Sequence, residues 1–145
     1  MGRVARLLAL PMADRLALAE AAMLLGLTRA MVLAVPFRIY SRLLGRHMAE
    51  AARMDTPAHA GAITRVKWAV ATMGRHLPWE CNCMNSSITG MLMLRRRGIP
   101  CTMYLGVVRE SPEKIKAHAW LRAGTQIIVG APVKQFTVVS TFAQP

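Results

Sequence analysis

Residues 83–98 read CMNSSITGMLMLRRRG, and this stretch decides the fold. Three arginines fill its last turn and Gly98 follows, which is typical of a helix end because cations favour that end of the helix dipole. Upstream, Leu77-Pro78-Trp79 ends the preceding segment, since a residue before proline is pushed toward extended geometry. The sequence therefore predicts a helix that begins near Cys83 and stops at Gly98, with the arginines as its solvated end.

Beyond Pro100 the composition changes to Val, Ile, Thr, Tyr and Phe, which favour strands. Tight connections are predicted at Gly124-Thr125 and at 130–132. The predicted strands are Cys101–Val108, Ile115–Ala123, Gln126–Val129 and Gln135–Phe142. We expect a short antiparallel meander, and helices followed by strands predict an α+β domain in which a helix packs on one face of the sheet.

The N-terminal part is predicted to be helical as far as about Gly45. Asp14 is placed to cap an element that runs toward Val35, and Pro36 interrupts it. Residues 46–62 are expected to form a loop or frayed helix, and helical periodicity returns over 63–74. We divide the chain into an N-terminal helical region, 1–62, and a core, 63–145, within one compact domain.

The apolar stretch 16–37 raises the question of a membrane span. Glu20 and Arg29 lie inside it with only eight residues between them. A spanning helix needs about 20 apolar residues, and a central arginine costs about 3 kcal/mol on insertion. We expect no span, and place this helix in the core, against a partner protein or partly on a membrane surface.

Composition excludes a disordered chain, because 54% of the 145 residues are hydrophobic and only 18% are charged. The formal charge of +12 favours anionic partners. The basic residues are scattered and aromatic residues make up only 6%, so we do not expect nucleic-acid binding. A membrane- or nucleic-acid-associated helical protein remains a hypothesis that salt-dependent binding would test.

The three cysteines, Cys81, Cys83 and Cys101, are an odd number without the spacing of a disulfide framework. The N-terminus lacks a small-residue cleavage site, and a cytoplasmic location is expected. A C-x-C pair with four scattered histidines does not match zinc-ligand spacing. We predict neither a metal site nor a cofactor.

Cys83 is the candidate nucleophile, because the N-terminus of a helix favours a thiolate. His118 lies in the middle of a predicted strand, in Ala117-His118-Ala119-Trp120. A cysteine at the start of a helix with a histidine on a neighbouring strand is the layout that places a thiolate against an imidazole. The alternatives are a cysteine that acts as a small core hydrophobe and a histidine with a structural role.

Several motifs give the chain a resemblance to a known family. They are Pro78-Trp79 through Cys83, Met91 through Pro100, Tyr104-Leu105-Gly106-Val107, Ala117 through Arg122 and Phe136-Thr137-Val138-Val139. Together they resemble the transglutaminase-like leader peptidases of lasso peptide biosynthesis, called the B2 protein or the C-terminal half of the fused B protein. Residues Asp14-Arg15 and Pro36-Phe37-Arg38 resemble the helical lead-in of that family.

The resemblance implies a papain/transglutaminase-like core and a cysteine peptidase that removes the leader of a ribosomally made lasso precursor. It also implies delivery of that precursor by a leader-binding B1 protein and later closure by a lasso cyclase. The nucleophile of the family falls four residues after the tryptophan, which selects Cys83 over Cys81, and the base is His118 of the His-Ala-Trp motif.

One position departs from the family. Its fused members carry an aspartate twelve residues after the histidine, where this chain has Gly130, and no Asp or Glu lies between His118 and Pro145. Either a neutral group such as Gln126 or Thr137 orients the imidazole, or a carboxylate comes from earlier in the chain, or the site works as a dyad. The missing acid motivates the alternative of a catalytically inactive scaffold that binds precursor or partner proteins.

Other groups of the predicted site are less specific. The amides at the start of the Cys83 helix are candidate oxyanion donors. Trp79 and Trp120 are candidates for substrate binding as walls of a cleft, and core packing explains them equally well. Glu110 and Glu113, in the predicted turn 109–113, are expected to be exposed.

Overall fold

The computed structural model describes residues 2–79, 81–130 and 136–144. Its helices are α1 (Arg3–Ala9), α2 (Met12–Ala34), α3 (Phe37–Tyr40), α4 (Ala60–His76) and α5 (Cys83–Arg96), with 3-10 turns η1 (Ser41–Leu44) and η2 (Pro57–His59). Its strands are β1 (Arg46–His47), β2 (Cys101–Ser111), β3 (Lys114–Ala123), β4 (Gln126–Val129) and β5 (Thr137–Gln144). The predicted α+β class is confirmed.

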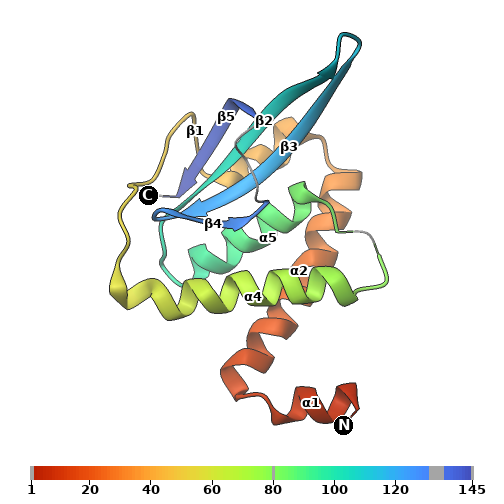
Figure 1. Cartoon of the computed structure of the whole chain (residues 1–145), viewed down its shortest axis with the longest axis vertical. Helices are drawn as coiled ribbons and strands as arrows, with labels where there is room; N and C mark the ends of the chain where they lie inside the picture. The colour runs from red at the N-terminus through yellow and green to blue at the C-terminus, as the bar shows by residue number, and fades with distance from the viewer. Residues whose placement is uncertain (1, 80, 131–135, 145) are drawn as a thin grey trace.

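The strands form an antiparallel sheet in the order β1-β5-β2-β3-β4 (Figure 1). The prediction of a simple meander was wrong, because β5 pairs with β2 instead of with β4. The lengths of the strands give a reason: β4 has four residues and could pair with only half of the eight-residue β5, whereas β2 has eleven. The crossover places β2, with β3 at its side, in the centre of the sheet.

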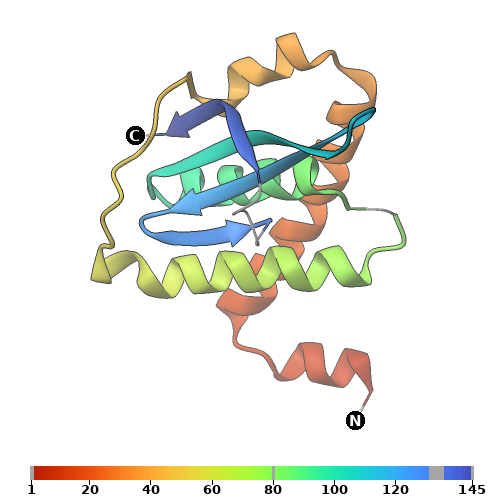
Figure 2. The same cartoon turned by 45° about the horizontal axis from the view of Figure 1, so that its top comes forward.

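Helix α5 lies against one face of the sheet, with α2 and α4 packed around it (Figures 1 and 2). Gly90 allows this close approach, because a Cβ there would lie 2.7 Å from the Leu121 side chain of β3. Buried residues of α2, α4, α5 and the sheet belong to one hydrophobic cluster. The N-terminal helix α2 is therefore part of the same core as the sheet.

Helix α5 begins and ends where the sequence predicts. Asn82 caps the start, where its side-chain oxygen accepts a hydrogen bond from the Asn85 amide at 2.9 Å. Gly98, at φ +70°, follows the last turn. The arginine run is not simply a solvated end, however, because Arg96 and Arg97 lie 2.5 and 2.8 Å from the carboxylate of Glu20. These ion pairs fasten α5 to α2.

The start of α2 differs from the prediction. Pro11 occupies the N-cap position, and Asp14 forms an ion pair with Arg65 of α4 at 2.9 Å instead of capping the helix. A proline fits at a helix start because the first amides lack helical acceptors in any case. Helix α2 is thus joined to α4 by Asp14 and to α5 by Glu20.

Arg122 on β3 is a buried cation, with an exposed fraction of 2%. Its guanidinium donates to the carbonyls of Ala51 at 2.7 Å and Gly124 at 2.6 Å and to the Tyr104 hydroxyl at 2.8 Å. A buried charge needs such hydrogen bonds to offset its desolvation. Arg122 therefore holds the irregular segment that follows β1 against the sheet.

Candidate active site

Cys83 is the first residue of α5, and its thiol is half-buried. The Asn85 amide is taken by the Asn82 cap, and the Ser86 amide makes the first helical bond, to the Asn82 carbonyl at 3.1 Å. The amides of Cys83 and Met84 come before that bond and have no helical acceptor. Two N–H groups without helical acceptors thus lie at the start of the helix that carries the thiol, where they can donate to a developing oxyanion.

The other two cysteines lie outside this environment. Cys81 precedes the helix, and burial raises its pKa while the charge of Arg29 and a hydrogen bond from Asn85 offset this in part. Cys101 opens β2 fully buried, and burial raises its pKa to about 12. At neutral pH the Cys101 thiol therefore stays protonated in the core.

His118 lies half-buried on β3, and its Nε2 is 2.6 Å from the backbone carbonyl oxygen of Gly130. A carbonyl can only accept, so Nε2 carries the proton. In the neutral imidazole Nδ1 then keeps its lone pair, and Nδ1 is the atom that can take a proton from a thiol. The Gly130 carbonyl fixes the tautomer that a general base requires.

The backbone at Gly130 explains how the carbonyl reaches the ring. Its φ of +93° is a conformation that L side chains rarely adopt, and a Cβ there would lie 2.7 Å from the Ala119 carbonyl oxygen. An aspartate could not stand at this position without moving β3. Gln126 and Thr137, the neutral groups considered from the sequence, are exposed, and the acceptor for His118 is the backbone.

Aromatic rings pack against the imidazole in one cluster. The His118 ring stacks on Phe136 at a centroid distance of 4.8 Å and on Trp120 at 5.9 Å, and Phe136 and Trp120 are themselves 6.0 Å apart. Trp120 also stacks on Tyr104 at 5.4 Å. Gly106 leaves room for this aromatic cluster, because a Cβ there would lie 2.7 Å from the Trp120 ring. The cluster restricts how the imidazole can turn.

The two tryptophans of the predicted site differ in exposure. Trp120 is 4% exposed and packs within the aromatic cluster, which leaves little of its surface for a substrate. Trp79 is half-buried and lines an apolar pocket of about 360 Å³ with Gly26, Arg29, Ala30 and Leu33 of α2. Substrate binding by either tryptophan stays a prediction.

Cys83 and His118 lie toward the same end of the contact between α5 and β3. The two elements run in the same direction and touch at Gly90 and Leu121 (Figures 1 and 2). Cys83 lies seven residues before Gly90 and His118 three before Leu121, and each separation is about 10 Å along its element. Within the described residues no hydrogen bond joins the thiol and the imidazole.

The carboxylates considered for the third catalytic position are elsewhere. Glu110 lies near the tip of the β2–β3 hairpin, where it is 3.4 Å from Lys114, and Glu113 is exposed in the turn. Both were expected to be exposed, and the structure agrees. Among the described residues, no group of three or more His, Cys, Asp and Glu side chains is gathered as a metal site.

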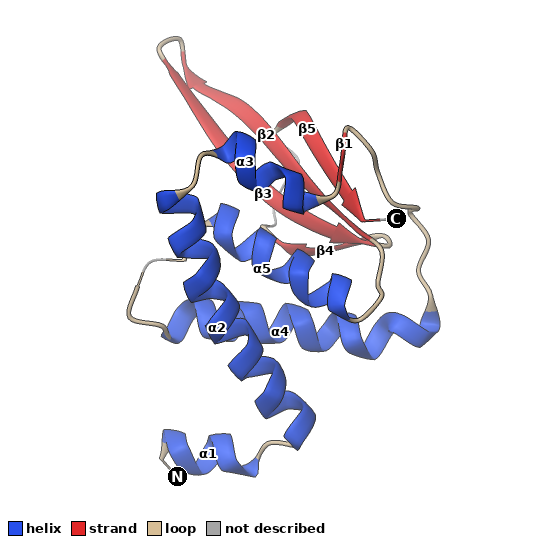
Figure 3. Ribbon diagram, turned by 180° about the vertical axis from the view of Figure 1, so that it is seen from behind, coloured by secondary structure: helices blue, strands red, loops and turns tan. Residues whose placement is uncertain are grey.

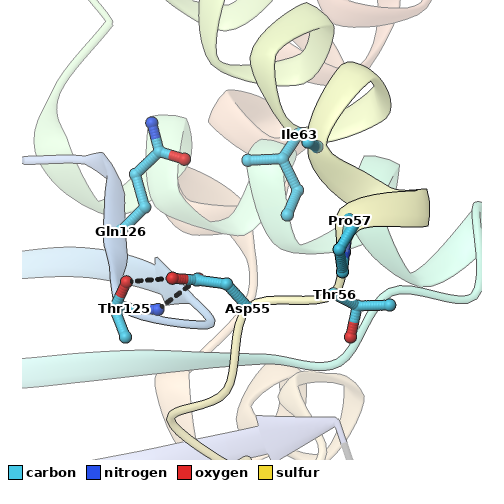
Figure 4. A pocket seen from close by; sticks show the side chains of 7 residues that line it. Asp55, Thr56, Pro57, Ile63, Thr125 and Gln126 are labelled. Atoms are coloured by element: carbon cyan, nitrogen blue, oxygen red, sulfur yellow. Dashed lines mark hydrogen bonds between the residues drawn. The ribbon is translucent and has the colours of Figure 1, made fainter.

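A separate pocket of about 430 Å³ lies beside the β3–β4 turn (Figure 4). The Asp55 carboxylate there accepts hydrogen bonds from the Thr125 amide at 2.9 Å and the Thr125 hydroxyl at 2.5 Å (Figure 4). These hydrogen bonds lower the pKa of Asp55. The Asp55 carboxylate thus holds the segment before α4 against the β3–β4 turn. The pocket lies at the start of β4, whereas Gly130, which accepts the hydrogen bond from His118, follows the end of β4.

The family model of the transglutaminase-like superfamily core domain matches residues 31–141. This chain belongs to the transglutaminase-like superfamily. No curated protein and no solved structure matches it. The match begins inside α2 and ends inside β5, and it contains all of α5 and β3 with Cys83 and His118.

Sequence reasoning did not find the role of the Gly130 carbonyl. The signal was present in part, because a glycine stood where an aspartate was expected. A backbone acceptor leaves no side-chain pattern, however, and its direction depends on the φ of +93°.

Proposed function

We propose that this protein is a cysteine peptidase that removes the leader from a ribosomally made lasso peptide precursor with the help of a leader-binding partner. Two residues carry the proposal. Cys83 stands at the start of α5, whose first two amides have no helical acceptor, and His118 is held through Nε2 by the Gly130 carbonyl. Transglutaminase-like membership supports thiol chemistry. The choice of a lasso precursor rests on the motif resemblance, above all Trp79 through Cys83 and the His-Ala-Trp sequence.

The reaction begins with transfer of the Cys83 proton to Nδ1 of His118. The thiolate then adds to the peptide carbonyl, and the amides of Cys83 and Met84 donate to the oxyanion. The imidazolium returns its proton to the leaving amine, which releases one product and leaves a thioester on Cys83. His118 next removes a proton from water, and the hydroxide adds to the thioester. The tetrahedral intermediate releases the carboxylic acid and the Cys83 thiolate, which takes the proton back from the imidazolium.

The partner is proposed on physical grounds as well. A domain of 145 residues has little surface with which to read a long leader. A partner that holds the leader would raise the effective concentration of the cleavage site near Cys83.

The test is cleavage of a lasso precursor, measured by mass spectrometry, with and without a leader-binding protein. We expect slow cleavage by the chain alone and fast cleavage with the partner. Equal rates under both conditions would contradict the role of the partner, and no cleavage under either would contradict the peptidase.

An inactive scaffold of the same fold is the second candidate, favoured by the missing hydrogen bond between thiol and imidazole. Alkylation of the Cys83 thiol at neutral pH distinguishes the two candidates. In an enzyme Cys83 reacts much faster than free cysteine in solution, whereas in a scaffold it reacts no faster than free cysteine.

A further inference from the structure

Helix α2 presents an apolar stripe to the outside along its whole length. Every exposed residue of this helix is Ala, Leu or Met, and the largest of them, with exposed fractions of 59% to 73%, are Met12, Leu16, Met23, Leu27 and Leu33. Exposed positions recur every three or four residues, so they share one face of a helix about 35 Å long. A continuous apolar face of this extent marks an interaction site.

The opposite face of α2 is already used. Ala17, Leu18, Ala21 and Leu25 are buried in the core, and the Thr28 hydroxyl lies 3.0 Å from the Thr89 hydroxyl of α5. Figure 3 shows α2 lying across α4 and α5, with its outer side uncovered. The helix is long and apolar enough to cross a membrane, but a span would remove these residues from the core. The stripe can instead lie on a surface.

Helix α1 extends the apolar surface. None of its residues is buried, and Val4, Leu7 and Leu8 are all exposed. It lies at an angle to α2 (Figures 1 and 3). Two apolar helices at an angle form a broad surface, which a bilayer can cover more readily than one partner helix.

The charges around this surface are positive. Residues 1–49 contain seven arginines, and Arg3, Arg6, Arg38 and Arg42 are exposed. The same segment has two carboxylates. Asp14 is paired with Arg65 of α4, and Glu20 is paired with Arg96 and Arg97 at the end of α5. Long cationic side chains beside exposed leucines suit an interface with anionic lipid headgroups.

We propose that α1 and the apolar stripe of α2 bind the protein to the surface of an anionic bilayer. The helices lie in the interface with their leucines and methionines among the acyl chains, and the arginines contact the headgroups. The start of α5, with Cys83, stays on the protein side of α2.

The test uses the whole chain and sedimentation with phosphatidylcholine vesicles, with and without phosphatidylglycerol. We expect binding to the anionic vesicles that weakens with salt. The double substitution Leu16→Glu/Leu27→Glu should weaken it about tenfold or more. The matched control, Met54→Glu/Ile115→Glu, adds the same charge at residues that are 72% and 61% exposed outside α1 and α2, and it should bind more tightly than the α2 variant. Circular dichroism checks that both variants fold.

Three results would overturn the proposal. One is that wild-type protein does not sediment with anionic vesicles, and another is equal weakening by the two double variants. The third is a stable dimer without vesicle binding that dissociates on Leu16→Glu/Leu27→Glu, which would assign the face to a second copy. None of these results bears on peptide cleavage, which is measured without vesicles.

Discussion

The Nε2 of His118 and the backbone carbonyl oxygen of Gly130 lie 2.6 Å apart. His118 is on β3, and Gly130 directly follows β4. The backbone carbonyl is the acceptor at the position where the motif resemblance predicts an aspartate. A neutral carbonyl orients the ring and fixes its tautomer, but it stabilises the imidazolium less than a carboxylate does.

We expect Cys83→Ala and His118→Ala each to abolish precursor cleavage, and Cys81→Ala and Cys101→Ala to retain it. Cys83 stands at the start of α5, where the first amides lack helical acceptors, whereas Cys81 precedes the helix and Cys101 is fully buried. Mass spectrometry of the products measures the rates, and melting temperatures identify any variant that is lost through unfolding. Full activity of Cys83→Ala would overturn the assignment of the nucleophile.

Gly130→Ala should lower cleavage more than tenfold, because its Cβ meets the Ala119 carbonyl and displaces the acceptor of His118. Gly98→Ala is the matched control: its φ of +70° gives a similar backbone strain of about 1 kcal/mol, but nothing lies within 4 Å of its Cβ. Cleavage rates and melting temperatures of both are compared. Unchanged cleavage by folded Gly130→Ala would show that the carbonyl does not position the imidazole.

Glu110→Gln and Glu113→Gln should each cost less than tenfold in cleavage rate, or about 1.4 kcal/mol. Both residues lie at the β2–β3 hairpin, where Glu110 is near Lys114 and Lys116. Charges at this end of the hairpin, several residue pairs from His118, act on it only weakly through solvent. A loss of a hundredfold or more in either variant would mean that the hairpin folds over the site during catalysis.

Glu20→Gln should destabilise the protein at neutral pH by about 1 kcal/mol. Burial raises the pKa of Glu20, but hydrogen bonds and charges from Arg96 and Arg97 outweigh it, and the pKa lies below its ordinary value of 4.5. A lowered folded-state pKa gives stability that is present above the ordinary value and is lost as the pH falls through the folded value.

The difference in melting temperature between wild type and Glu20→Gln should therefore be present at pH 7 and shrink in acid. Glu113→Gln, at an exposed turn, should show little difference at either pH. A Glu20→Gln difference that persists unchanged well below pH 4.5 would show that the contacts stabilise by shape and not by charge.

The sequence alone was enough to predict the helix that begins at Cys83, the strand that carries His118 and the strands before and after it in the chain. Its signals are local: the break at Leu77-Pro78-Trp79 before the helix, arginines and glycine at its end, and β-branched residues in the strands. The α+β class followed from the order of these elements, and the motif resemblance selected Cys83 and His118. The superfamily match agrees with that class.

Only the tertiary structure decided the contacts made by groups far apart in the chain. The pairing of β5 with β2 depends on the lengths of competing strands, and the ion pairs of Glu20 with Arg96 and Arg97 depend on how α2 crosses α5. The acceptor for His118 is a backbone atom, which every residue type carries, so no side-chain pattern can indicate it. Its direction is set by the positive φ of Gly130 and the packing of that residue against β3.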